Sequence, residues 1–363
     1  MKIIAFYLPQ FHRIDVNDKN WGEGFTEWEN VKSAKSLCKK HIQPRIPYNN
    51  NYYDLESTDV LKWQCKLANQ YGIYGFCFYH YWFSGKPLME TPIKNLLNNA
   101  DIKIRYCLSW ANESWYKKTG FQKELILKQE YGDKNEWQKH CQFLLPYFMD
   151  KRYIKIDGKP VFIIYRPELI ERLEDMITYM NQFMCEHGAG EICFIYQYIH
   201  YNHKKDKGGR LFSYGIEYQP VYAKYAQMRT PAMLFRKMMN IFFTKSVRNR
   251  NRLSLLTLNY DRTWKRILKH KPIDEKIFPG AFVNWDNTPR YGARGSFYGN
   301  YSVEKFEKYL EMQIIHSRRI YKKEMLFLFA WNEWGEGGYL EPDIQENYAR
   351  LKAVKKALAS TGE

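Results

Sequence analysis

The sequence has no long hydrophobic run. No window of its 363 residues approaches the ~18 apolar residues that a membrane-spanning helix needs. The start, MKIIAFYLPQFH, has one Lys and then a short apolar run that ends in Pro. It lacks the longer apolar stretch and small-residue cleavage site of a secretory signal. From these absences we expect a protein that neither spans a membrane nor is secreted.

Cysteine is scarce and unpatterned. The seven cysteines are an odd number and form no CxxC pair. Cys77, Cys107 and Cys193 lie inside expected strands, where a thiol behaves as a small buried hydrophobic group. This usage favours a reduced, cytoplasmic protein without structural disulfide bonds or a zinc site.

Motifs for metals and phosphates are also missing. There is no HxH or HExxH, and the pairs Cys38/His41 and His200/His203 have no second pair at zinc-site spacing. The sequence also lacks a dinucleotide-binding fingerprint and a convincing DxD. We therefore predict no metal ion and no cofactor.

Positive charge is in excess, and it is concentrated in one region. The net charge is +17, and between His203 and Pro272 the 17 Lys and Arg outnumber three acids, a difference of +14. No nucleic-acid-binding motif accompanies these cations, so we predict no nucleic-acid partner. Segment 236–252, RKMMNIFFTKSVRNRNR, mixes apolar residues with cations. It is either a solvated helix with a buried stripe or an interfacial helix that docks on an anionic membrane.

Short apolar or β-branched runs alternate with helical patterns. This alternation predicts parallel strands joined by crossover helices, and eight such strands favour a closed barrel. The predicted fold class is α/β, a (β/α)8 TIM barrel in a single domain over residues 1–363, with a basic, insertion-like region around 201–276. The expected strands are Ile3–Tyr7, Ile73–Tyr79, Ile104–Ser109, Val161–Tyr165, Ile192–Tyr196, Gly215–Tyr218, Ala281–Trp285 and Met325–Ala330. The expected helices include Ser57–Tyr71, Glu136–Met149, Leu169–His187, Val303–Tyr321 and Ile344–Ala359, with Asn135 and Ser302 as N-caps and Gly188 as a stop.

Aromatic residues make up 17% of the chain, and many stand beside Asn, Glu or His. Five polar-aromatic segments follow expected strands: YLPQFH with WGEGFTEWENV, FYHYWF, LSWANESW, VNWDNTPR and FAWNEWGEGGYLEPD. The active sites of such barrels lie at the carboxyl ends of the strands. Aromatic faces stack on sugar rings while polar groups bind hydroxyls, although each ring alone could simply fill the barrel mouth. The predicted substrate-binding residues are Tyr7, His12, Glu27, Trp28, Tyr79, His80, Trp82, Trp110, Asn112, Glu113, Trp115, Trp285, Asp286, Arg290, Asn332 and Trp334.

Glu333 and Glu336 are the predicted catalytic residues. They leave a strand end on a tight turn within WNEWGEG. Cleavage of a glycosidic bond needs one carboxyl group to protonate the leaving oxygen and a second to handle the opposite charge. Two nearby carboxylates also push their pKa values apart, which keeps one protonated near neutral pH. The alternative is that one or both are solvated loop residues.

Other polar residues have two interpretations each. Glu27 and Glu113 either bind hydroxyls and tune the pair or anchor their loops through buried salt bridges. Asp286 and Arg290 are expected to form a loop-shaping ion pair, unless Arg290 holds an anionic group bidentately. His12 and His80, at strand ends, are expected to form hydrogen bonds rather than bind a metal.

At these segments the chain resembles the glycoside hydrolase family 99-like proteins, specifically the WbsX-type group of bacterial O-antigen and capsule loci. The matching segments are YLPQFH, GFTEWENV, YGFCFYHYWF, LSWANESW, WDNTPR and WNEWGEGGYLEPD. The resemblance implies a (β/α)8 barrel and an α-linked glycan as substrate.

Family 99 enzymes are retaining endo-α-mannosidases with an asparagine–glutamate–tryptophan–x–glutamate–glycine motif, which Asn332 to Gly337 match. The resemblance implies that Glu336 is the general acid and that Glu333 is the base that assists the sugar's own 2-hydroxyl in attacking the anomeric carbon. The departure is Gly335, where those hydrolases carry His.

Three functions therefore stay open. The first is an endo-α-glycosidase or transglycosylase. The second is a glycosyltransferase with a nucleotide-sugar or lipid-linked donor, and the third is a glycan-binding barrel without catalysis. The expected partner is an oligosaccharide or a lipid-linked glycan, and a lipid-linked glycan would bring the protein to the inner membrane face.

Anionic liposomes test the membrane hypothesis for segment 236–252. Because each cation near an anionic surface contributes ~1 kcal/mol, we expect the protein to sediment with phosphatidylglycerol vesicles at low salt. Rising salt should release it, because screening weakens the attraction. Neutral phosphatidylcholine vesicles are the control. Failure to sediment at low salt would contradict the hypothesis.

Overall fold

The computed structural model describes residues 1–119, 122–198, 210–226 and 257–362. Its centre is a sheet with the strand order β12-β10-β9-β8-β4-β2-β1-β15-β13, and neighbours along this path are parallel. Only Pro279 separates β12 from β13, so the two ends of the path meet and close a barrel. The strands are β1 (Lys2–Tyr7), β2 (Gly75–Phe83), β4 (Arg105–Trp110), β8 (Lys159–Ile164), β9 (Cys193–Tyr198), β10 (Tyr214–Glu217), β12 (Ile277–Phe278), β13 (Gly280–Phe282) and β15 (Met325–Phe329). The predicted TIM barrel is confirmed, and each expected strand overlaps an observed one.

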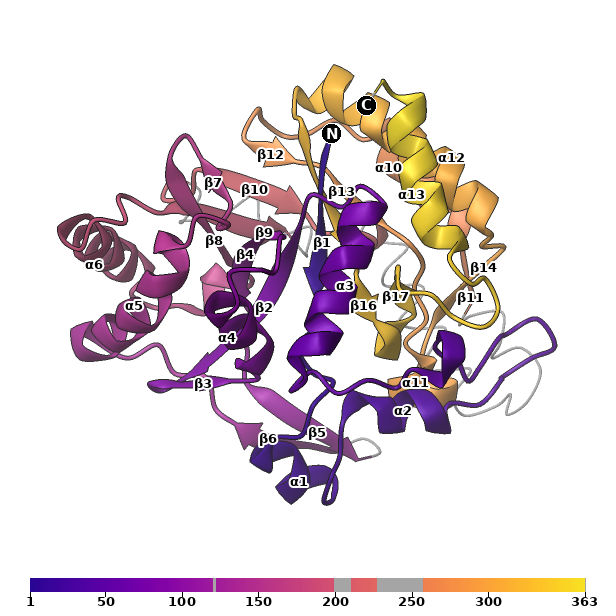
Figure 1. Cartoon of the computed structure of the whole chain (residues 1–363), viewed down its shortest axis with the longest axis horizontal. Helices are drawn as coiled ribbons and strands as arrows, with labels where there is room; N and C mark the ends of the chain where they lie inside the picture. The colour runs from indigo at the N-terminus through magenta and orange to yellow at the C-terminus, as the bar shows by residue number, and fades with distance from the viewer. Residues whose placement is uncertain (120–121, 199–209, 227–256, 363) are drawn as a thin grey trace.

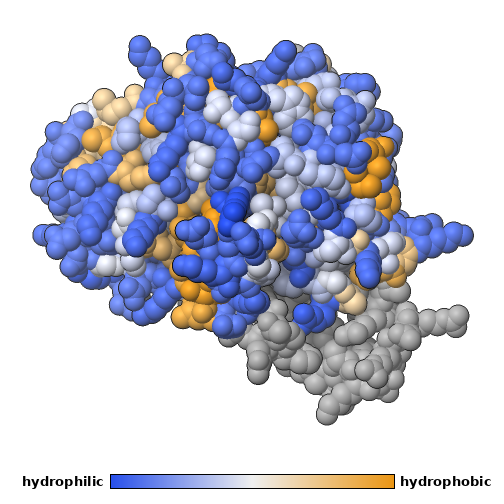
Figure 2. Space-filling view, turned by 60° about the horizontal axis from the view of Figure 1, so that its bottom comes forward, coloured by the Kyte–Doolittle hydropathy of each residue, from blue (hydrophilic) through white to orange (hydrophobic). Residues whose placement is uncertain are grey.

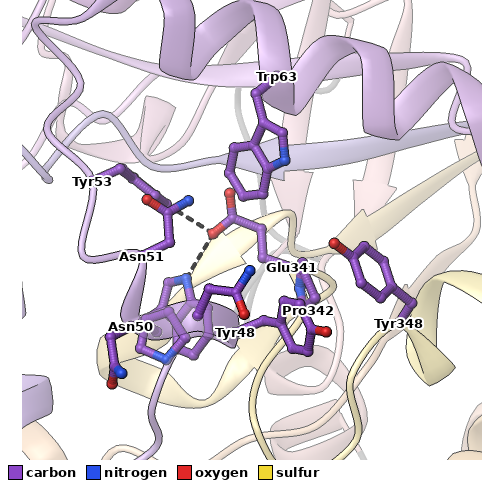
Figure 3. Close-up of a pocket in the computed structure, with 11 residues that line it drawn as sticks. Tyr48, Asn50, Asn51, Tyr53, Trp63, Glu341, Pro342 and Tyr348 are labelled. Atoms are coloured by element: carbon purple, nitrogen blue, oxygen red, sulfur yellow. Dashed lines mark hydrogen bonds between the residues drawn. The ribbon is translucent and has the colours of Figure 1, made fainter.

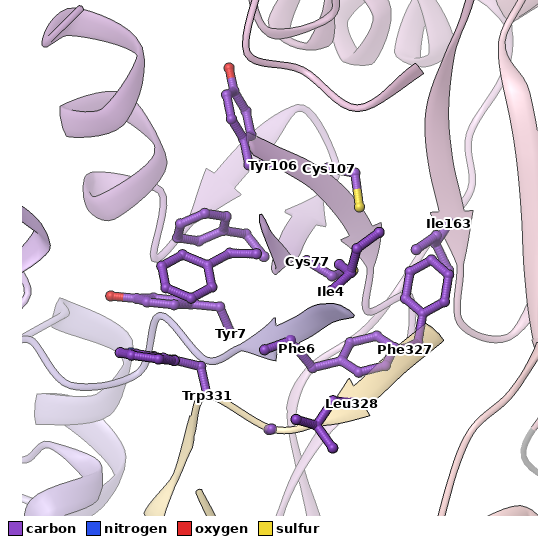
Figure 4. Close-up of a cluster of buried hydrophobic side chains, with 14 of the residues drawn as sticks. Ile4, Phe6, Tyr7, Cys77, Tyr106, Cys107, Ile163, Phe327, Leu328 and Trp331 are labelled. Atoms are coloured by element: carbon purple, nitrogen blue, oxygen red, sulfur yellow. The ribbon is translucent and has the colours of Figure 1, made fainter. Parts of the chain in front are cut away.

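Continuous apolar runs explain why these segments form a parallel barrel. All five residues of β15, MLFLF, are buried, as are the last five of β8, KPVFII. Strands covered on both faces read as unbroken hydrophobic runs rather than as an alternating pattern. Figure 4 shows the result around β1, where Tyr7 and Trp331 lie on one side of the strand and Ile163 and Phe327 on the other.

Helices surround the barrel, with α5 and α6 on one flank and α12 and α13 on the other (Figure 1). Ser302 caps α12 as predicted, and α6 ends two residues before Gly188. The N-cap of α5 is Asp133 and not Asn135, because the Asp133 carboxylate accepts from the backbone N–H groups of Asn135 and Glu136. The helices are α3 (Thr58–Gln70), α4 (Thr91–Asn98), α5 (Lys134–Met149), α6 (Leu173–Glu186), α7 (Val221–Ala226), α10 (Tyr260–Lys269), α12 (Val303–His316), the π-turn η5 (Ser317–Tyr321) and α13 (Ala349–Ser360).

Small elements gather at the carboxyl end of the barrel, and Figure 1 shows α1, α2, α11, β3, β5 and β6 among them at the bottom, opposite the two chain termini. They are α1 (Asp15–Trp21), α2 (Glu27–Ser33), η1 (Tyr48–Asn50), β3 (Lys86–Leu88), β5 (Trp115–Thr119), β6 (Gln122–Leu127), η2 (Pro167–Leu169), α11 (Thr288–Tyr291), η4 (Gly292–Arg294), β16 (Asn332–Glu333), η6 (Trp334–Glu336) and β17 (Gly338–Tyr339). Short strands elsewhere are β7 (Lys155–Ile156), β11 (Thr257–Asn259) and β14 (Phe297–Gly299). Turned toward the viewer in Figure 2, this end is mostly hydrophilic with hydrophobic patches between.

The basic segment 236–252 lies outside the described residues. Within the described ranges, no helix has both the length and the apolar character needed to cross a bilayer.

A glycine is required where the barrel closes. Gly280 of β13 passes β10 so closely that a Cβ there would overlap the carbonyl oxygen of Glu217. We expect Gly280→Ala to lower the free energy of unfolding by at least ~1–3 kcal/mol, as overpacking of a rigid core does. Urea denaturation measures the change. Lys352→Ala, on the exposed face of α13, is the control, and an unchanged midpoint for the Gly280 variant would show that the strands can separate to admit a methyl group.

Candidate active site

A tight reversal after β15 carries both predicted catalytic residues. β16 pairs antiparallel with β17, and the turn η6 connects them. Gly337 leaves this turn with φ +63°, in the left-handed region that favours glycine. The side chain of Asn332 fixes the turn to the first strand, because its Oδ1 accepts from Leu8 N at 2.7 Å and its Nδ2 donates to Leu8 O at 2.9 Å. The turn is therefore held rigidly against β1.

Arg290 joins three carboxylates from separate loops. Its Nε donates to Glu27 Oε1 at 2.7 Å, while Nη2 and Nη1 lie 2.9 Å from Glu333 Oε1 and Glu336 Oε1. The side chains of Glu27 and Glu333 are 9% and 5% exposed, and that of Glu336 is 19% exposed. We call Arg290 and these three glutamates the Arg290 cluster. One guanidinium balances only one of three negative charges, so the cluster favours the uptake of a proton.

The absent side chain at Gly335 makes room for this cluster. A Cβ at 335 would overlap Glu27 Oε1 and would stand 2.9 Å from Arg290 Nε. Arg290 and Glu27 thus occupy the space that a side chain at 335 would need. A larger residue at 335 would therefore require the side chains of Glu27 and Arg290 to shift.

Burial and crowding of like charges shift the carboxyl groups of this turn. Burial raises the pKa of Glu333 well above its ordinary value, and the charges of Glu336 and Glu27 add to the rise while Arg290 opposes it. The pKa of Glu336 is also raised, again by burial first, with Arg290 opposing and Glu27 adding. The pair therefore keeps a proton to higher pH than an ordinary carboxyl group does, which favours the role of a general acid.

The Arg290 cluster lies in a cleft with two arms. The larger arm has a volume of about 1070 Å³ and the smaller about 380 Å³. Both are lined by Glu113, Tyr165, Arg166 and Glu336, so Glu336 stands where the arms meet. Rings line both arms, among them Trp21, Phe25, Trp115 and Tyr116 in the larger and Tyr218, Trp285 and Tyr298 in the smaller.

The structure brings about half of the predicted site residues to this cleft. Those that line it are Glu27, Tyr79, Glu113, Trp115, Trp285, Arg290, Glu333 and Glu336. The others are buried outside its lining: Tyr7, His12, Trp28, His80, Trp82, Trp110, Asn112, Asp286, Asn332 and Trp334. Several of these hold the site from behind. Asn112, for example, accepts from Arg166 N at 2.7 Å and donates to Arg166 O at 2.8 Å.

Side chains alternate between the two faces of β2, which explains why some of the predicted residues line the cleft and others do not. The strand continues to Phe83, beyond the predicted end at Tyr79. Tyr79 and Tyr81 therefore face the cleft, while His80 contacts His140 on α5 at 2.9 Å, and Trp82 stacks on the same ring at 4.6 Å.

Asp286 and Arg290 do not form the predicted ion pair. Asp286 accepts from His41 Nε2 at 2.9 Å and from Gln43 Nε2 at 2.8 Å, and these contacts belong to a buried network away from the cleft. The hydrogen bond from His41 and the charge of Arg45 lower the pKa of Asp286 to about 2, against the opposing effect of burial. Asp286 also supports the turn, since its N–H donates to Glu336 O at 2.6 Å.

Glu27 and Glu113 each form a salt bridge, which is buried at Glu27 and partly exposed at Glu113, and their binding of sugar hydroxyls stays a prediction. Glu27 binds Arg290, and Glu113 Oε1 lies 2.6 Å from Arg166 Nη1, yet both carboxylates line the cleft.

His12 is buried, and its Nδ1 has no hydrogen-bond partner among the described residues. The described part of the chain has no group of three or more His, Cys, Asp or Glu side chains placed to hold a metal ion.

Sequence reasoning missed several residues that line the cleft: Gln10, Tyr81, Tyr165, Arg166, Tyr218 and Lys224. Tyr165 and Tyr218 were the last residues of expected strands, so the same rule of strand ends would have selected them. The Tyr79 hydroxyl donates to that of Tyr218 at 2.9 Å, which joins the second and sixth strands of the barrel beneath the cleft.

Comparison with known proteins agrees with this fold. A family model described as "Glycosyltransferase WbsX" matches residues 3–354. The protein WxcX from two strains of Xanthomonas campestris pv. campestris is 33% and 32% identical over 98% of this chain. These matches cover 49% of WxcX, so the chain spans about half the length of the curated relatives it matches.

Solved structures share the architecture at low sequence identity. The family 99 endo-α-mannosidase from Bacteroides thetaiotaomicron superposes with a TM-score of 0.56 at 13% identity, covering 99% of this chain and 96% of that one. A structure described as a glycoside hydrolase-like protein gives 0.58 at 12% identity, with 98% and 93% covered. These similarities establish a glycoside-hydrolase-like fold.

The Arg290 cluster predicts an unusual pH dependence of stability. Because the pKa of Glu333 is higher in the folded protein than its ordinary value of 4.5, the folded state binds more protons between these two pKa values. Stability contributed by this group is therefore lost as pH rises through that window. We expect Glu333→Gln to remove part of this loss, so that its melting temperature gains on wild type as the pH rises above the ordinary pKa of 4.5.

Calorimetry at a series of pH values measures this effect. Glu174→Gln, on the exposed face of α6, removes a carboxylate outside the cluster and should leave the pH slope unchanged. A Glu333→Gln slope equal to that of wild type would mean that the carboxyl group of Glu333 titrates normally.

Proposed function

Because the chain belongs to the WbsX glycosyltransferase family, we propose that it is a carbohydrate-active enzyme that cleaves or transfers α-linked glycan, with Glu333 and Glu336 as the acid–base pair. The observation that carries this proposal is the position of Glu336 at the junction of the two cleft arms. An enzyme that acts within a glycan must bind sugar units on both sides of the reacting bond.

The lining of the cleft suits a glycan. Trp115 and Tyr116 in the larger arm and Trp285 in the smaller offer aromatic faces for the C–H side of pyranose rings. Gln10 and Tyr81, already joined by a 2.8 Å hydrogen bond, offer polar groups that can hold hydroxyls in fixed geometry.

The difference in exposure supports a division of roles within the pair. Glu336 is more exposed than Glu333, so a leaving oxygen reaches it first, and we assign Glu336 as the proton donor. The pair shares one proton, and in the reactive form this proton is on Glu336. Glu333, which lies deeper against Arg290, is then a carboxylate and acts as the base, taking the proton of the sugar's 2-hydroxyl. The oxygen of that hydroxyl attacks the anomeric carbon while the bond to the leaving oxygen breaks and Glu336 protonates that oxygen. Water or an acceptor hydroxyl then attacks the anomeric carbon and gives its proton to the Glu336 carboxylate. The anhydro bond breaks at the same time, and Glu333 returns its proton to the 2-oxygen.

Transfer is the second candidate, and the name of the family favours it. Arg166 and Lys224 line the smaller arm, where cations would suit the diphosphate of a nucleotide-sugar or lipid-linked donor. The expected substrate is then a lipid-linked precursor of an O-antigen or capsule, with segment 236–252 as the contact to the membrane.

Substitution of each catalytic carboxyl group tests the proposal. We expect Glu333→Gln and Glu336→Gln each to lower the rate on end-labelled α-linked oligosaccharides by about 10²–10⁴-fold, as the loss of a general acid or base does. Capillary electrophoresis of the products measures the rate, with Glu174→Gln as the matched control.

The co-substrate separates the two chemistries. Product formed without any nucleotide sugar indicates cleavage or transglycosylation, whereas strict dependence on a nucleotide or lipid-linked donor indicates transfer. If both Gln variants keep the wild-type rate, or support glycan assembly as well as wild type does, the barrel binds glycan without catalysing a reaction through this pair.

A further inference from the structure

A second cavity lies behind the catalytic turn, apart from the two-armed cleft. We call it the rear pocket; its volume is about 360 Å³ and its lining shares no residue with that of either cleft arm. Trp334, which stands between Glu333 and Glu336 in the sequence, contributes to its wall. The other lining residues are Pro47, Tyr48, Asn49, Asn50, Asn51, Tyr53, Trp63, Glu341, Pro342 and Tyr348 (Figure 3).

The floor of the rear pocket is polar but already satisfied. Glu341 is buried, and its Oε2 accepts from Tyr53 Oη at 2.8 Å and from Trp334 Nε1 at 2.7 Å. Gln64 Nε2 donates to Oε1 at 2.7 Å. Figure 3 shows this carboxylate at the centre of the site with two of these bonds. The Glu341 side chain is therefore held in one position, and a ligand would not need a positive charge to satisfy it.

The walls and the rim of the rear pocket carry side-chain donors and acceptors that are available to a ligand. Tyr48, Trp63 and Tyr348 are half-buried, and Asn49 to Asn51 are exposed at the rim. Among the described residues, none of the side-chain polar atoms of these six residues has a hydrogen-bond partner. Three consecutive amides and three ring donors thus surround one small cavity.

The rim is held in place by its backbone. Asn49 and Asn50 both adopt left-handed conformations, with φ of 56° and 54°. Tyr48 N donates to Pro342 O at 2.9 Å, and Ile344 N donates to Ile46 O at 3.0 Å, so this loop is pinned to the segment that follows the catalytic turn. Binding would cost little ordering of the protein, which favours even a small ligand.

The chemistry of the lining selects the class of ligand. It contains no Lys, Arg or His, so it offers nothing to neutralise a phosphate or a carboxylate. Aromatic faces combined with amides suit a ring that is apolar on its faces and hydroxylated at its edges. The volume lies at the lower end of the ~300–1,000 Å³ of small-molecule sites, which fits a mono- or disaccharide.

We propose that the rear pocket is a second, non-catalytic binding site for an uncharged pyranose unit. It would hold a part of the glycan, or a branch of it, that does not pass through the cleft. The choice of a sugar as ligand rests on the proposed function, but the site itself rests on its own lining.

Saturation-transfer NMR with the full chain tests this site. The probes are methyl glycosides of mannose, glucose, galactose and N-acetylglucosamine, with glucuronic acid as an anionic comparison. We expect at least one neutral glycoside to bind, and Trp63→Ala and Tyr348→Ala each to weaken its binding by about 2- to 12-fold, the value of one ring contact. Trp285→Ala, in the cleft, and Glu333→Gln should leave that binding unchanged. Melting curves identify any variant that fails to fold, and either wall substitution suffices for the test.

The outcomes separate this proposal from the catalytic one. Binding that survives Glu333→Gln but is lost with Trp63→Ala or Tyr348→Ala supports the rear pocket even if no turnover is found. Binding that is lost only with Trp285→Ala places the sugar in the cleft alone and overturns the rear pocket while the proposed function stands. Absence of binding by every neutral glycoside, or tighter binding of glucuronic acid, also overturns it.

Discussion

The guanidinium of Arg290 bonds to carboxylates from the loops after β1 and β15, while Arg290 itself comes from the loop after β13. Three loops at the carboxyl end of the barrel meet at this one cation. Without the cation, three buried glutamates would repel one another, and the cost of an uncompensated buried charge is ~3–5 kcal/mol. With it, one positive charge holds three loops together and still leaves an excess of negative charge for a proton to relieve. The same ion pairs therefore join the loops and raise the proton affinity of the site, as the proposed acid–base chemistry requires.

The fold was predictable because its signal repeats along the chain. Each parallel strand is covered on both faces, so it appears in the sequence as a short apolar run, and each expected strand overlaps an observed one. Segment ends were less certain for a physical reason. Asp133, two residues before Asn135, is the N-cap of α5 because its carboxylate accepts hydrogen bonds from two backbone N–H groups. The order of residues alone does not show which side chain can reach those groups.

The sequence predicted where along the chain the candidate site lies, but not which side chains line the cleft. A strand end selects a place along the chain, whereas the direction of each side chain follows from where the strand stops. Because β2 continues to Phe83, His80 and Trp82 point to α5 and Tyr81 points to the cleft. The predicted ion pair of Arg290 with Asp286 was wrong for a related reason. Asp286 is four residues away in the sequence, whereas Glu27, the observed partner, is distant in sequence but adjacent in space. Sequence proximity is a poor guide to ion pairs where loops from several strands meet.

Gly335 has a consequence for the charges around it. The ends of the Arg290 and Glu27 side chains stand where a side chain at 335 would begin, so any larger residue there requires both to move. The geometry of the ion pairs in the cluster thus depends on the smallest residue of the turn. A change at a position that carries no functional group of its own would alter the electrostatics of its two neighbouring glutamates.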